Sequence, residues 1–176
     1  MKQDSIVMSI LQAPPARKLN AYLGAGCINQ RIWNLLTGRE ATYGIEDYDL
    51  VYFDPIHTSK EAQEKIKKTF EDLFPDLHIE CTNQARVHLW YEAYFGKKME
   101  PLTSVEDGID GWPTTASAIA AYLDEDDELL LYAPFGLRDL LSLTLRPNRT
   151  RITKAVYENK VEKWRAKWPE LSVRPW

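Results

Sequence analysis

The stretch from Tyr22 to Asp54 constrains the fold of this chain more than any other part of its sequence. It begins with Gly24 and Gly26, which permit a tight turn and close backbone approach, and continues into a helical pattern over about residues 27–37. The apolar run within residues 46–54 then has the composition of a buried strand. A turn, a helix and a central strand in this order predict helices layered on a sheet.

Patterns along the rest of the chain predict an α/β (α+β) fold with a mixed central sheet of about five strands flanked by helices. We expect strands at residues 20–23, 46–54 and 77–82 and a β-hairpin of 116–123 with 128–133, although the alanines of 116–123 also allow a helix. We expect helices at residues 5–12 (capped by Asp4 or Ser5), 27–37 (stopped by Gly38), from a capping box at Thr58 and Glu61 to Pro75, 83–94 (closed by Gly96), 103–109, 137–145 (stopped by Pro147) and 153–167. One face of the second helix carries Ile28, Ile32, Leu35 and Leu36, and the third should turn Ile66, Phe70, Leu73 and Phe74 inward. We expect one domain, residues 1–176, with the last helix packed on it.

Charge and cysteine content argue against several classes of protein. Lys and Arg number 22 against 26 Asp and Glu, a net charge of −4, with a basic cluster only near the carboxyl end, so extended nucleic-acid binding is not favoured. Cys27 and Cys81 are too few for a disulfide framework or, with three scattered histidines, for a zinc site, so we expect reduced thiols and a cytoplasmic protein. The apolar run Ile6 to Leu11 is too short to insert into a membrane.

Asp47 and Asp49 are the first candidates for chemistry. They stand two residues apart on a predicted strand, so their side chains leave the same face with Cα atoms about 6.5 Å apart. Carboxylates are hard oxygen ligands for Mg²⁺ or Mn²⁺, and Glu80 on the next predicted strand would supply a third. The alternative interpretation is that the aspartates only solvate a loop and that Glu80 is an edge-strand charge facing water.

The turn at Gly24, Ala25 and Gly26 is a candidate phosphate site. A turn that enters a helix presents backbone N–H groups and the positive end of the helix to an anion. Arg31 on that helix and Arg39 at its end would add charge. Glycines at a turn more often serve the backbone conformation than phosphate binding. The prediction therefore depends on the turn, the helix and the carboxylates occurring together in this order.

Two sets of motifs resemble known proteins. The run Gly24-Ala25-Gly26, a helix, Gly38 and then Asp47-Tyr48-Asp49-Leu50 resembles the head-domain signature of the nucleotidyltransferase superfamily, including the tRNA-nucleotidyltransferase and poly(A) polymerase branch. More closely, YFDP at 52–55, NQARVHLWY at 83–91, WPT at 112–114 and APFGLRDL at 133–140 resemble a bacterial family of nucleotidyltransferase-like proteins, over roughly residues 19–169.

This resemblance implies the nucleotidyltransferase fold, Asp47 and Asp49 as the metal-binding pair, and Glu80 as the best match for the third acidic position. Relatives place an Arg-Asn pair on the helix after the turn, where this chain has Asn29-Gln30. Contact with the triphosphate from this helix would then require Arg31.

Asn83 and Arg86 have two interpretations of equal weight. On a helix they lie three residues apart and can face one ligand, which together with the resemblance makes them candidates for nucleotide binding. Alternatively, Asn83 caps the helix and Arg86 pairs with an acidic group.

The leading hypothesis is a domain that binds a nucleoside triphosphate with Mg²⁺ and transfers a nucleotidyl group to an acceptor hydroxyl that the sequence does not identify. Its rival is a nucleotide- or partner-binding protein that keeps the fold without turnover, which the Asn29-Gln30 pair favours. A third hypothesis, a toxin-like enzyme that modifies tRNA, needs a basic groove that the acidic balance does not encourage.

Overall fold

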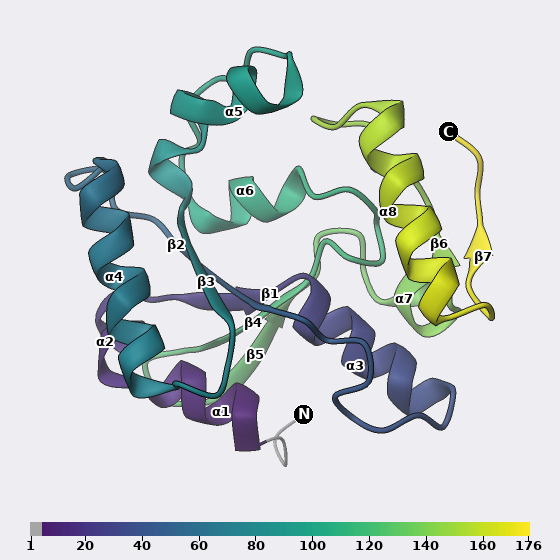
Figure 1. The fold of residues 1–176 in the computed structure, drawn as a ribbon, viewed down its shortest axis with the longest axis horizontal. Coiled ribbons are helices and arrows are strands. Elements are labelled where there is room, and N and C mark those ends of the chain that lie inside the picture. Colours follow the sequence, from purple (N-terminus) through teal and green to yellow (C-terminus); the bar gives the residue numbers. More distant parts are fainter. Residues whose placement is uncertain (1–4) are drawn as a thin grey trace.

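Five strands form one mixed sheet in the order β3-β2-β1-β4-β5 (Figure 1). A computed structural model describes residues 5–176, with side chains from Ile6 onward. The strands are β1 (Tyr22–Gly24), β2 (Tyr48–Tyr52), β3 (Ile79–Asn83), β4 (Ala120–Leu123) and β5 (Leu129–Tyr132). Only the β2–β3 pair of this sheet is parallel, because the helix α4 (Lys60–Leu73) carries the chain back between them. The expected five-stranded mixed sheet is confirmed, and β4 with β5 forms the predicted antiparallel hairpin.

Short helices and one small second sheet complete the fold. The remaining elements are α1 (Ser5–Gln12), α2 (Pro14–Lys18), α3 (Gly26–Leu36), a 3₁₀ turn η1 (Gln84–Arg86), α5 (His88–Phe95), α6 (Val105–Asp110), α7 (Arg138–Leu141) and α8 (Lys154–Lys167), with β6 (Thr144–Leu145) pairing in parallel with β7 (Ser172–Val173). The helix expected at 83–94 is therefore η1 followed by α5, which ends at Gly96 in the left-handed conformation as predicted. The expected cap at Asp4 or Ser5 lies outside the side chains that the structure describes.

The two faces of the sheet bury different clusters, because successive strand residues point to opposite sides. The main core contains Leu23, Leu50 and Ile79 from the strands, covered by α1, α3 and α4 through apolar side chains such as Ile10, Ile28 and Phe70. The opposite face carries a smaller cluster in which Val51 and Ala120 pack with Val105 and Ile109 of α6. Asp49 lies two residues before Val51 and therefore projects from this second face.

Three local predictions are wrong. Ser59, not Thr58, caps α4, since its hydroxyl accepts from the backbone N–H of Ala62 at 3.1 Å. Leu73 at the end of α4 is 50% exposed and does not turn inward as expected. The helix expected at 137–145 is only four residues long, because Leu143 adopts a positive φ of 53° and the chain then enters β6.

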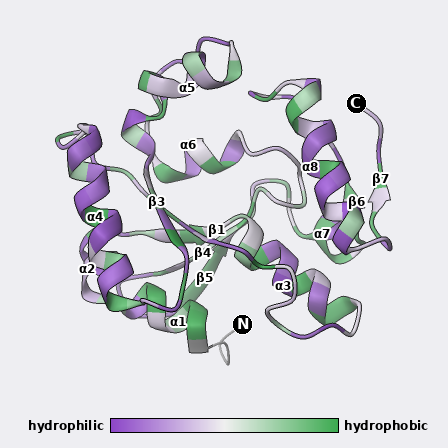
Figure 2. Ribbon diagram, in the orientation of Figure 1, coloured by the Kyte–Doolittle hydropathy of each residue, from purple (hydrophilic) through white to green (hydrophobic). Residues whose placement is uncertain are grey.

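The C-terminal helix α8 is fixed to α3 by aromatic side chains. Trp164 and Trp168 meet the ring of Trp33 with centroids 5.4 and 5.6 Å apart, and Trp168 donates to Asn34 Oδ1 at 2.8 Å. Figure 2 shows α8 and α4 with many hydrophilic residues, as expected for helices that pack on a core from outside. Among the described residues, no helix is long and apolar enough to cross a membrane.

Candidate active site

The register of the sheet places Asp49 between Gly24 and Glu80. Gly24 of β1 is the antiparallel partner of Asp49 in β2, and Glu80 of β3 is its parallel partner on the other side. Directly opposed residues of neighbouring strands project on the same face. The Asp49 and Glu80 side chains therefore leave the sheet on one side, next to a position without a side chain.

Asp47 lies beside the first residue of α3. A Cβ atom built on Gly26 would stand 2.8 Å from Gln30 Nε2, which is too close, and 3.7 Å from Asp47 Oδ1, which is ordinary van der Waals contact. Cys27, the next residue of α3, donates its thiol to the carbonyl oxygen of Gly24 at 3.2 Å and lies within the electrostatic reach of both aspartates. The turn at 24–26 and the two aspartates are thus neighbours in space.

The carboxyl group of Asp49 is poised to share a proton or a cation. Burial raises its pKa to about 7, and the negative charge of Asp47 is the second cause. Lys160 of α8 is the cation that opposes this shift most, while Glu80 adds to it. A mostly buried carboxylate beside a second one is costly when both are ionised, and a bound cation would relieve that cost.

Glu80 is held by two basic neighbours. Lys67 of α4 donates to its two carboxylate oxygens at 2.8 and 2.9 Å, and His78 Nε2 lies 2.9 Å from Oε1. Within residues 5–176 no three His, Cys, Asp or Glu side chains are grouped closely enough to hold a metal ion. The structure therefore brings Asp47 and Asp49 to the turn but does not assemble Glu80 with them into one group of ligands.

The turn itself adopts a backbone conformation that favours glycine, although Ala25 occupies it. Ala25 has φ 51° and ψ −130°, a strained region for a residue with a Cβ atom, and strain of this kind is concentrated at functional sites. Within the described residues, no hydrogen bond joins the backbone N–H of Gly26 or Cys27 to an oxygen of another residue. These two groups open the first turn of α3, where N–H groups have no partner within the helix and can receive an anion.

Gly24 is small for a reason that the sequence did not reveal. A Cβ atom at this position would overlap the ring of Trp112 and stand 3.0 Å from Ala120 Cβ, so the ring packs directly on the strand next to Asp49. Trp112 belongs to the Trp112-Pro113-Thr114 motif, and that motif was the sequence signal that could have pointed to this position. Gly24 therefore accommodates an aromatic ring, whereas Gly26 faces Asp47.

The positive side chain that we expected from α3, Arg31, does not point to the two aspartates. Arg31 is half-buried and interacts with Tyr48, and burial lowers its pKa. Tyr48 precedes Asp49 on β2 and therefore points to the opposite face of the sheet. The side-chain amide of Asn29 turns back to the carbonyl oxygen of Ala25. Arg39, at the end of α3, pairs with Glu170 at 2.9 Å.

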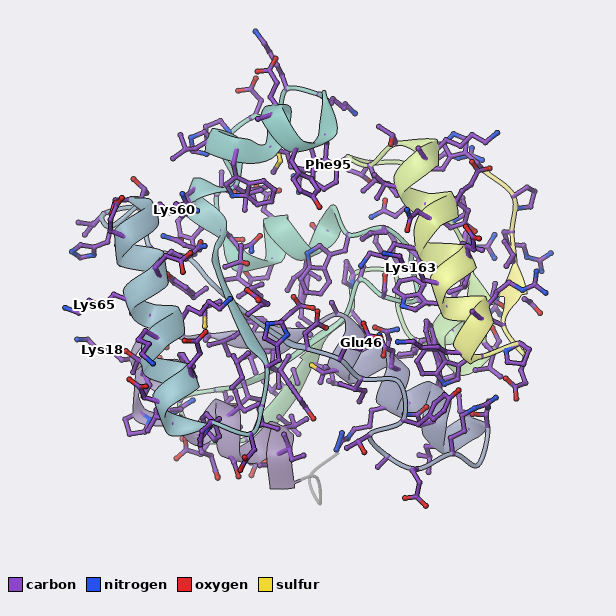
Figure 3. All side chains as sticks on the ribbon, in the orientation of Figure 1. Lys18, Glu46, Lys60, Lys65, Phe95 and Lys163 are labelled. Carbon is purple, nitrogen blue, oxygen red and sulfur yellow. The ribbon has the colours of Figure 1, made fainter. Side chains whose placement is uncertain are left out.

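Positive charge reaches the start of β2 from α8 instead. Lys160, Lys163 and Lys167 follow the spacing of one helix face, and their electrostatic partners are Asp49 for the first and Glu46 for the other two. Figure 3 shows Glu46 and Lys163 in the region between the start of β2 and α8. Sequence reasoning missed these lysines because α8 is more than 100 residues away from Asp49 in the chain.

Asn83 and Arg86 lie at the other end of β3. Asn83 Oδ1 accepts from the backbone N–H of Asp54 and Ala85, and its Nδ2 donates to the carbonyl oxygens of Asp54 and His57. The capping alternative for Asn83 is thus confirmed. Arg86 donates to Thr58 O at 3.3 Å and Gln63 Oε1 at 3.4 Å. It acts electrostatically on Glu61 but, among the described residues, forms no ion pair with Asp47, Asp49 or Glu80.

The register separates these two residues from the carboxylates. Asn83 is opposite Tyr52, whereas Glu80 is opposite Asp49, and three residues of strand correspond to about 10 Å. Asn83 is also an odd number of residues from Glu80, so it points to the other face of the sheet. The structure therefore does not bring Asn83 and Arg86 to the two aspartates.

Two cavities of the described residues lie away from the aspartates. A groove of about 720 Å³ runs between α8 and the C-terminal segment. A cavity of about 320 Å³ is lined by residues that follow β6 and β7, together with Thr115 and Phe135. Neither is lined by Asp47 or Asp49. The candidate active site is therefore defined by its carboxylates and by the turn at 24–26.

Comparisons with solved structures show the same fold. A structure described as revealing a CCA-adding enzyme head domain is 24% identical to this chain, covers 100% of it and 98% of its own length, and superimposes with a TM-score of 0.74. Two structures of a tRNA-processing enzyme also match. The apo form is 16% identical over 91% of this chain with a TM-score of 0.52, and the form with CTP is 18% identical over 96% with a TM-score of 0.50. This chain spans 43% of each of those two proteins.

A search of curated proteins gave no match. The model of a family described as nucleotidyltransferase matches residues 16–173. That range includes the turn at 24–26, both aspartates, Glu80 and the whole five-stranded sheet. The resemblance predicted from the sequence motifs is confirmed, and the chain belongs to this nucleotidyltransferase family.

Proposed function

We propose that this chain is a nucleotidyltransferase that uses Mg²⁺ or Mn²⁺ to transfer a nucleotidyl group from a nucleoside triphosphate to an acceptor hydroxyl. One observation carries the proposal: Asp49 is the register partner of Gly24, and Asp47 lies at Gly26, so both carboxylates adjoin the start of α3. Carboxylates next to a helix N-terminus combine the ligands of a divalent cation with a receptor for the phosphates that accompany it.

Asp47 and Asp49 fit a divalent cation. The pKa of Asp49 is raised to about 7 by burial and by the charge of Asp47, which is the environment of a carboxylate pair that gains from a cation. When bound, the cation supplies neutralisation of the phosphate charge that develops as the bond to the leaving pyrophosphate breaks. Glu80 would join the two aspartates only after leaving Lys67 and His78, so we place its carboxylate as a base that assists deprotonation of the acceptor hydroxyl.

The triphosphate would lie against the backbone N–H groups of Gly26 and Cys27. Lys160 on α8 would supply the positive side chain that Asn29-Gln30 and Arg31 do not provide at this turn, since Lys160 already acts on Asp49 across the site. These groups hold the α-phosphorus in place while the acceptor oxygen forms its bond and pyrophosphate leaves.

A structure with the same fold contains CTP, and we propose that this chain likewise binds a nucleoside triphosphate. We place the protein in the cytoplasm on the basis of its two free, buried cysteines.

The test is a screen of ATP, CTP, GTP and UTP, each labelled at the α-phosphate, with Mg²⁺ and a cell extract. We expect pyrophosphate release and label on an acceptor with at least one nucleotide, and neither in the presence of EDTA. Label on a protein, an RNA or a small molecule identifies the acceptor class. Absence of pyrophosphate release with all four nucleotides in Mg²⁺ and in Mn²⁺ would refute the proposal.

The second candidate is a protein that binds a nucleotide without turnover. Two observations favour it: Arg31 is turned toward Tyr48, and Glu80 is already held by Lys67 and His78. Calorimetry with the same four nucleotides separates the two candidates. Binding without release of pyrophosphate in any extract supports the second.

A further inference from the structure

The carboxyl end of the chain carries a charge opposite to that of the whole. Residues 138–176 contain ten Lys and Arg against four Asp and Glu, although the complete chain has a net charge of −4. Such a local excess of positive charge attracts anions even on an acidic protein.

Part of this charge lines the cavity of about 320 Å³. Its lining is Thr115, Phe135, Arg146, Pro147, Asn148, Arg149, Arg174 and Pro175. Three arginines therefore share a space comparable in size to the smaller pockets that hold ligands. None of these residues belongs to the candidate active site.

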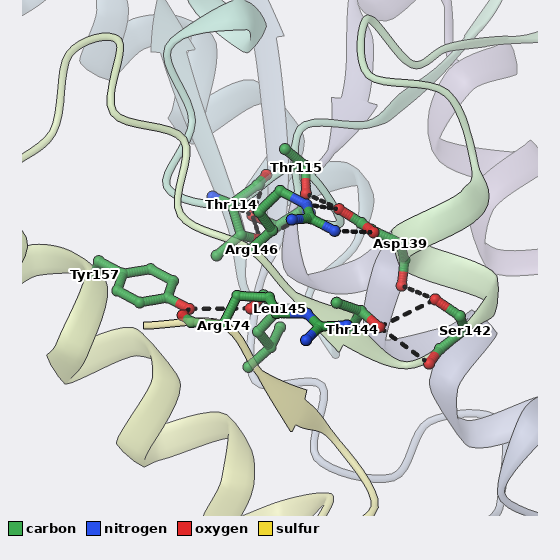
Figure 4. A network of polar contacts seen from close by, with 10 residues as sticks. Thr114, Thr115, Asp139, Ser142, Thr144, Leu145, Arg146, Tyr157 and Arg174 are labelled. Carbon is green, nitrogen blue, oxygen red and sulfur yellow. Dashed lines mark hydrogen bonds and ion pairs between the residues drawn. The ribbon is translucent and has the colours of Figure 1, made fainter. Parts of the chain in front are cut away.

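The three arginines differ in how their charge is used. Arg146 donates to both carboxylate oxygens of Asp139 at 2.8 and 3.3 Å, and Thr115 donates to the same carboxylate at 2.7 Å (Figure 4). Arg149 lies over the ring of Trp176 at 5.5 Å. No ion pair within residues 5–176 involves the guanidinium of Arg149 or Arg174. Arg174 acts on Asp139 only electrostatically and from a longer distance than Arg146. Three guanidinium groups thus share one carboxylate at this cavity, and neither Arg149 nor Arg174 is held in an ion pair by the described residues.

The walls of the cavity are set by the fold. Asn148 is buried and its amide nitrogen donates to the carbonyl oxygens of Asp110 and Trp112 at 2.7 and 2.8 Å, which fixes the loop that carries Arg149. The backbone N–H of Arg174 donates to Leu145 O at 2.8 Å, which fixes the other wall. Phe135, 42% exposed, supplies an open aromatic surface at this cavity.

We propose that this cavity is a second anion site that binds the phosphate of a phosphate ester through Arg149 and Arg174, with Phe135 against the organic part of the ligand. Guanidinium groups bind phosphate oxygens in pairs, and an adjacent aromatic surface adds stacking for a base. A free mononucleotide and one unit of a single-stranded oligonucleotide share this chemistry.

The experiment uses the full chain in EDTA, so that binding at Asp47 and Asp49 through a divalent cation does not contribute. UMP is titrated by calorimetry, and fluorescein-labelled U12 is titrated by fluorescence anisotropy. The variant Arg149→Gln with Arg174→Gln is compared with the wild type and with Lys60→Gln with Lys65→Gln, which removes the same charge from α4 on another side of the molecule (Figure 3). All substituted side chains are exposed, and thermal melting verifies that both variants fold.

We expect the arginine variant to lose at least 10-fold in affinity for one or both probes and the lysine variant to stay within 2-fold of the wild type. Stronger loss for U12 identifies a strand as the ligand, and stronger loss for UMP identifies a free ester. Equal loss in both variants or no binding by the wild type would overturn the proposal. Polyglutamate, an anion without phosphate, is titrated as a further probe, and binding of it as tight as that of U12 would also overturn the proposal. These results do not depend on nucleotidyl transfer, so failure here leaves the proposed function standing.

Discussion

The two ends of the β2–β3 strand pair both carry polar side chains, but these side chains differ in how far their charges and hydrogen-bonding groups have partners. At the end where both strands start, Asp47 and Asp49 share a mostly buried position, and the pKa of Asp49 is raised by burial and by its neighbour. At the opposite end, all four hydrogen-bonding positions of Asn83 are used, and Asn83 is 0% exposed. We infer that the first end is suited to a bound cation, whereas at the second end the hydrogen bonds of Asn83 are complete and its role is structural.

The largest effect should come from the first end. Asp49→Asn should reduce nucleotidyl transfer by about 10³-fold or more, which corresponds to about 4 kcal/mol, because one of two cation ligands is lost. Pyrophosphate release under saturating nucleotide measures this loss. Asp47→Asn should behave alike, and equal release by either variant and the wild type would contradict the assignment.

A substitution at the second end should lower the stability of the protein and leave its affinity for nucleotide unchanged. Asn83→Ala leaves buried backbone groups of Asp54, His57 and Ala85 without partners, so we expect a loss of roughly 2–4 kcal/mol in the free energy of unfolding. Urea denaturation measures it, with Asn159→Ala on the exposed surface of α8 as a matched control. If Asn83→Ala kept full stability but lost affinity for nucleotide, Asn83 would have to be assigned to the nucleotide-binding site.

The pH dependence of stability should differ between the wild type and Asp49→Asn. The pKa of Asp49 is about 7 in the folded protein and 3.8 is its ordinary value, so between these limits the folded state binds more protons than the unfolded state. This group therefore stabilises the fold fully below about pH 4, and its contribution is lost as the pH rises through 7.

After allowance for partial exposure, the loss should be on the order of 2 kcal/mol in metal-free buffer. Urea midpoints of both proteins at pH 5 and pH 8 give the difference due to Asp49 and its coupling to Asp47 and Glu80, because the contributions of acids that do not interact with Asp49 cancel. Parallel pH profiles of the two proteins would show that Asp49 is not perturbed.

The smallest effect concerns the pair that holds Glu80. Lys67 and Glu80 are 23% and 38% exposed as side chains, so Lys67→Ala should cost less than about 1 kcal/mol. If Glu80, once released from Lys67, also joins the two aspartates as a third ligand of the cation, removing Lys67 should lower the Mg²⁺ concentration needed for half-maximal activity by a few-fold. Lys68→Ala, which breaks the exposed pair with Asp72, is the control. An unchanged Mg²⁺ requirement in both variants would leave Glu80 as a structural residue.

Most of the sheet could be predicted because its strands carry local signals. The apolar run of β2, the hairpin of β4 and β5 and the glycine stop after α3 each depend on neighbours in sequence. The short α7 could not be predicted in the same way, since its leucines fit a longer helix. The positive φ of Leu143 and the pairing of β6 with β7 outweigh that preference.

For the candidate site, the sequence by itself determined the residue types and their order: a small-residue turn, a helix and two carboxylates spaced to share one face. Only the tertiary structure decided which charges meet them. Lys160 arrives from a helix more than 100 residues away, Lys67 engages Glu80, and Arg31 is turned toward Tyr48. The physical reason is that periodicity and turn chemistry act between near neighbours, whereas the partner of a buried charge is set by how distant elements pack.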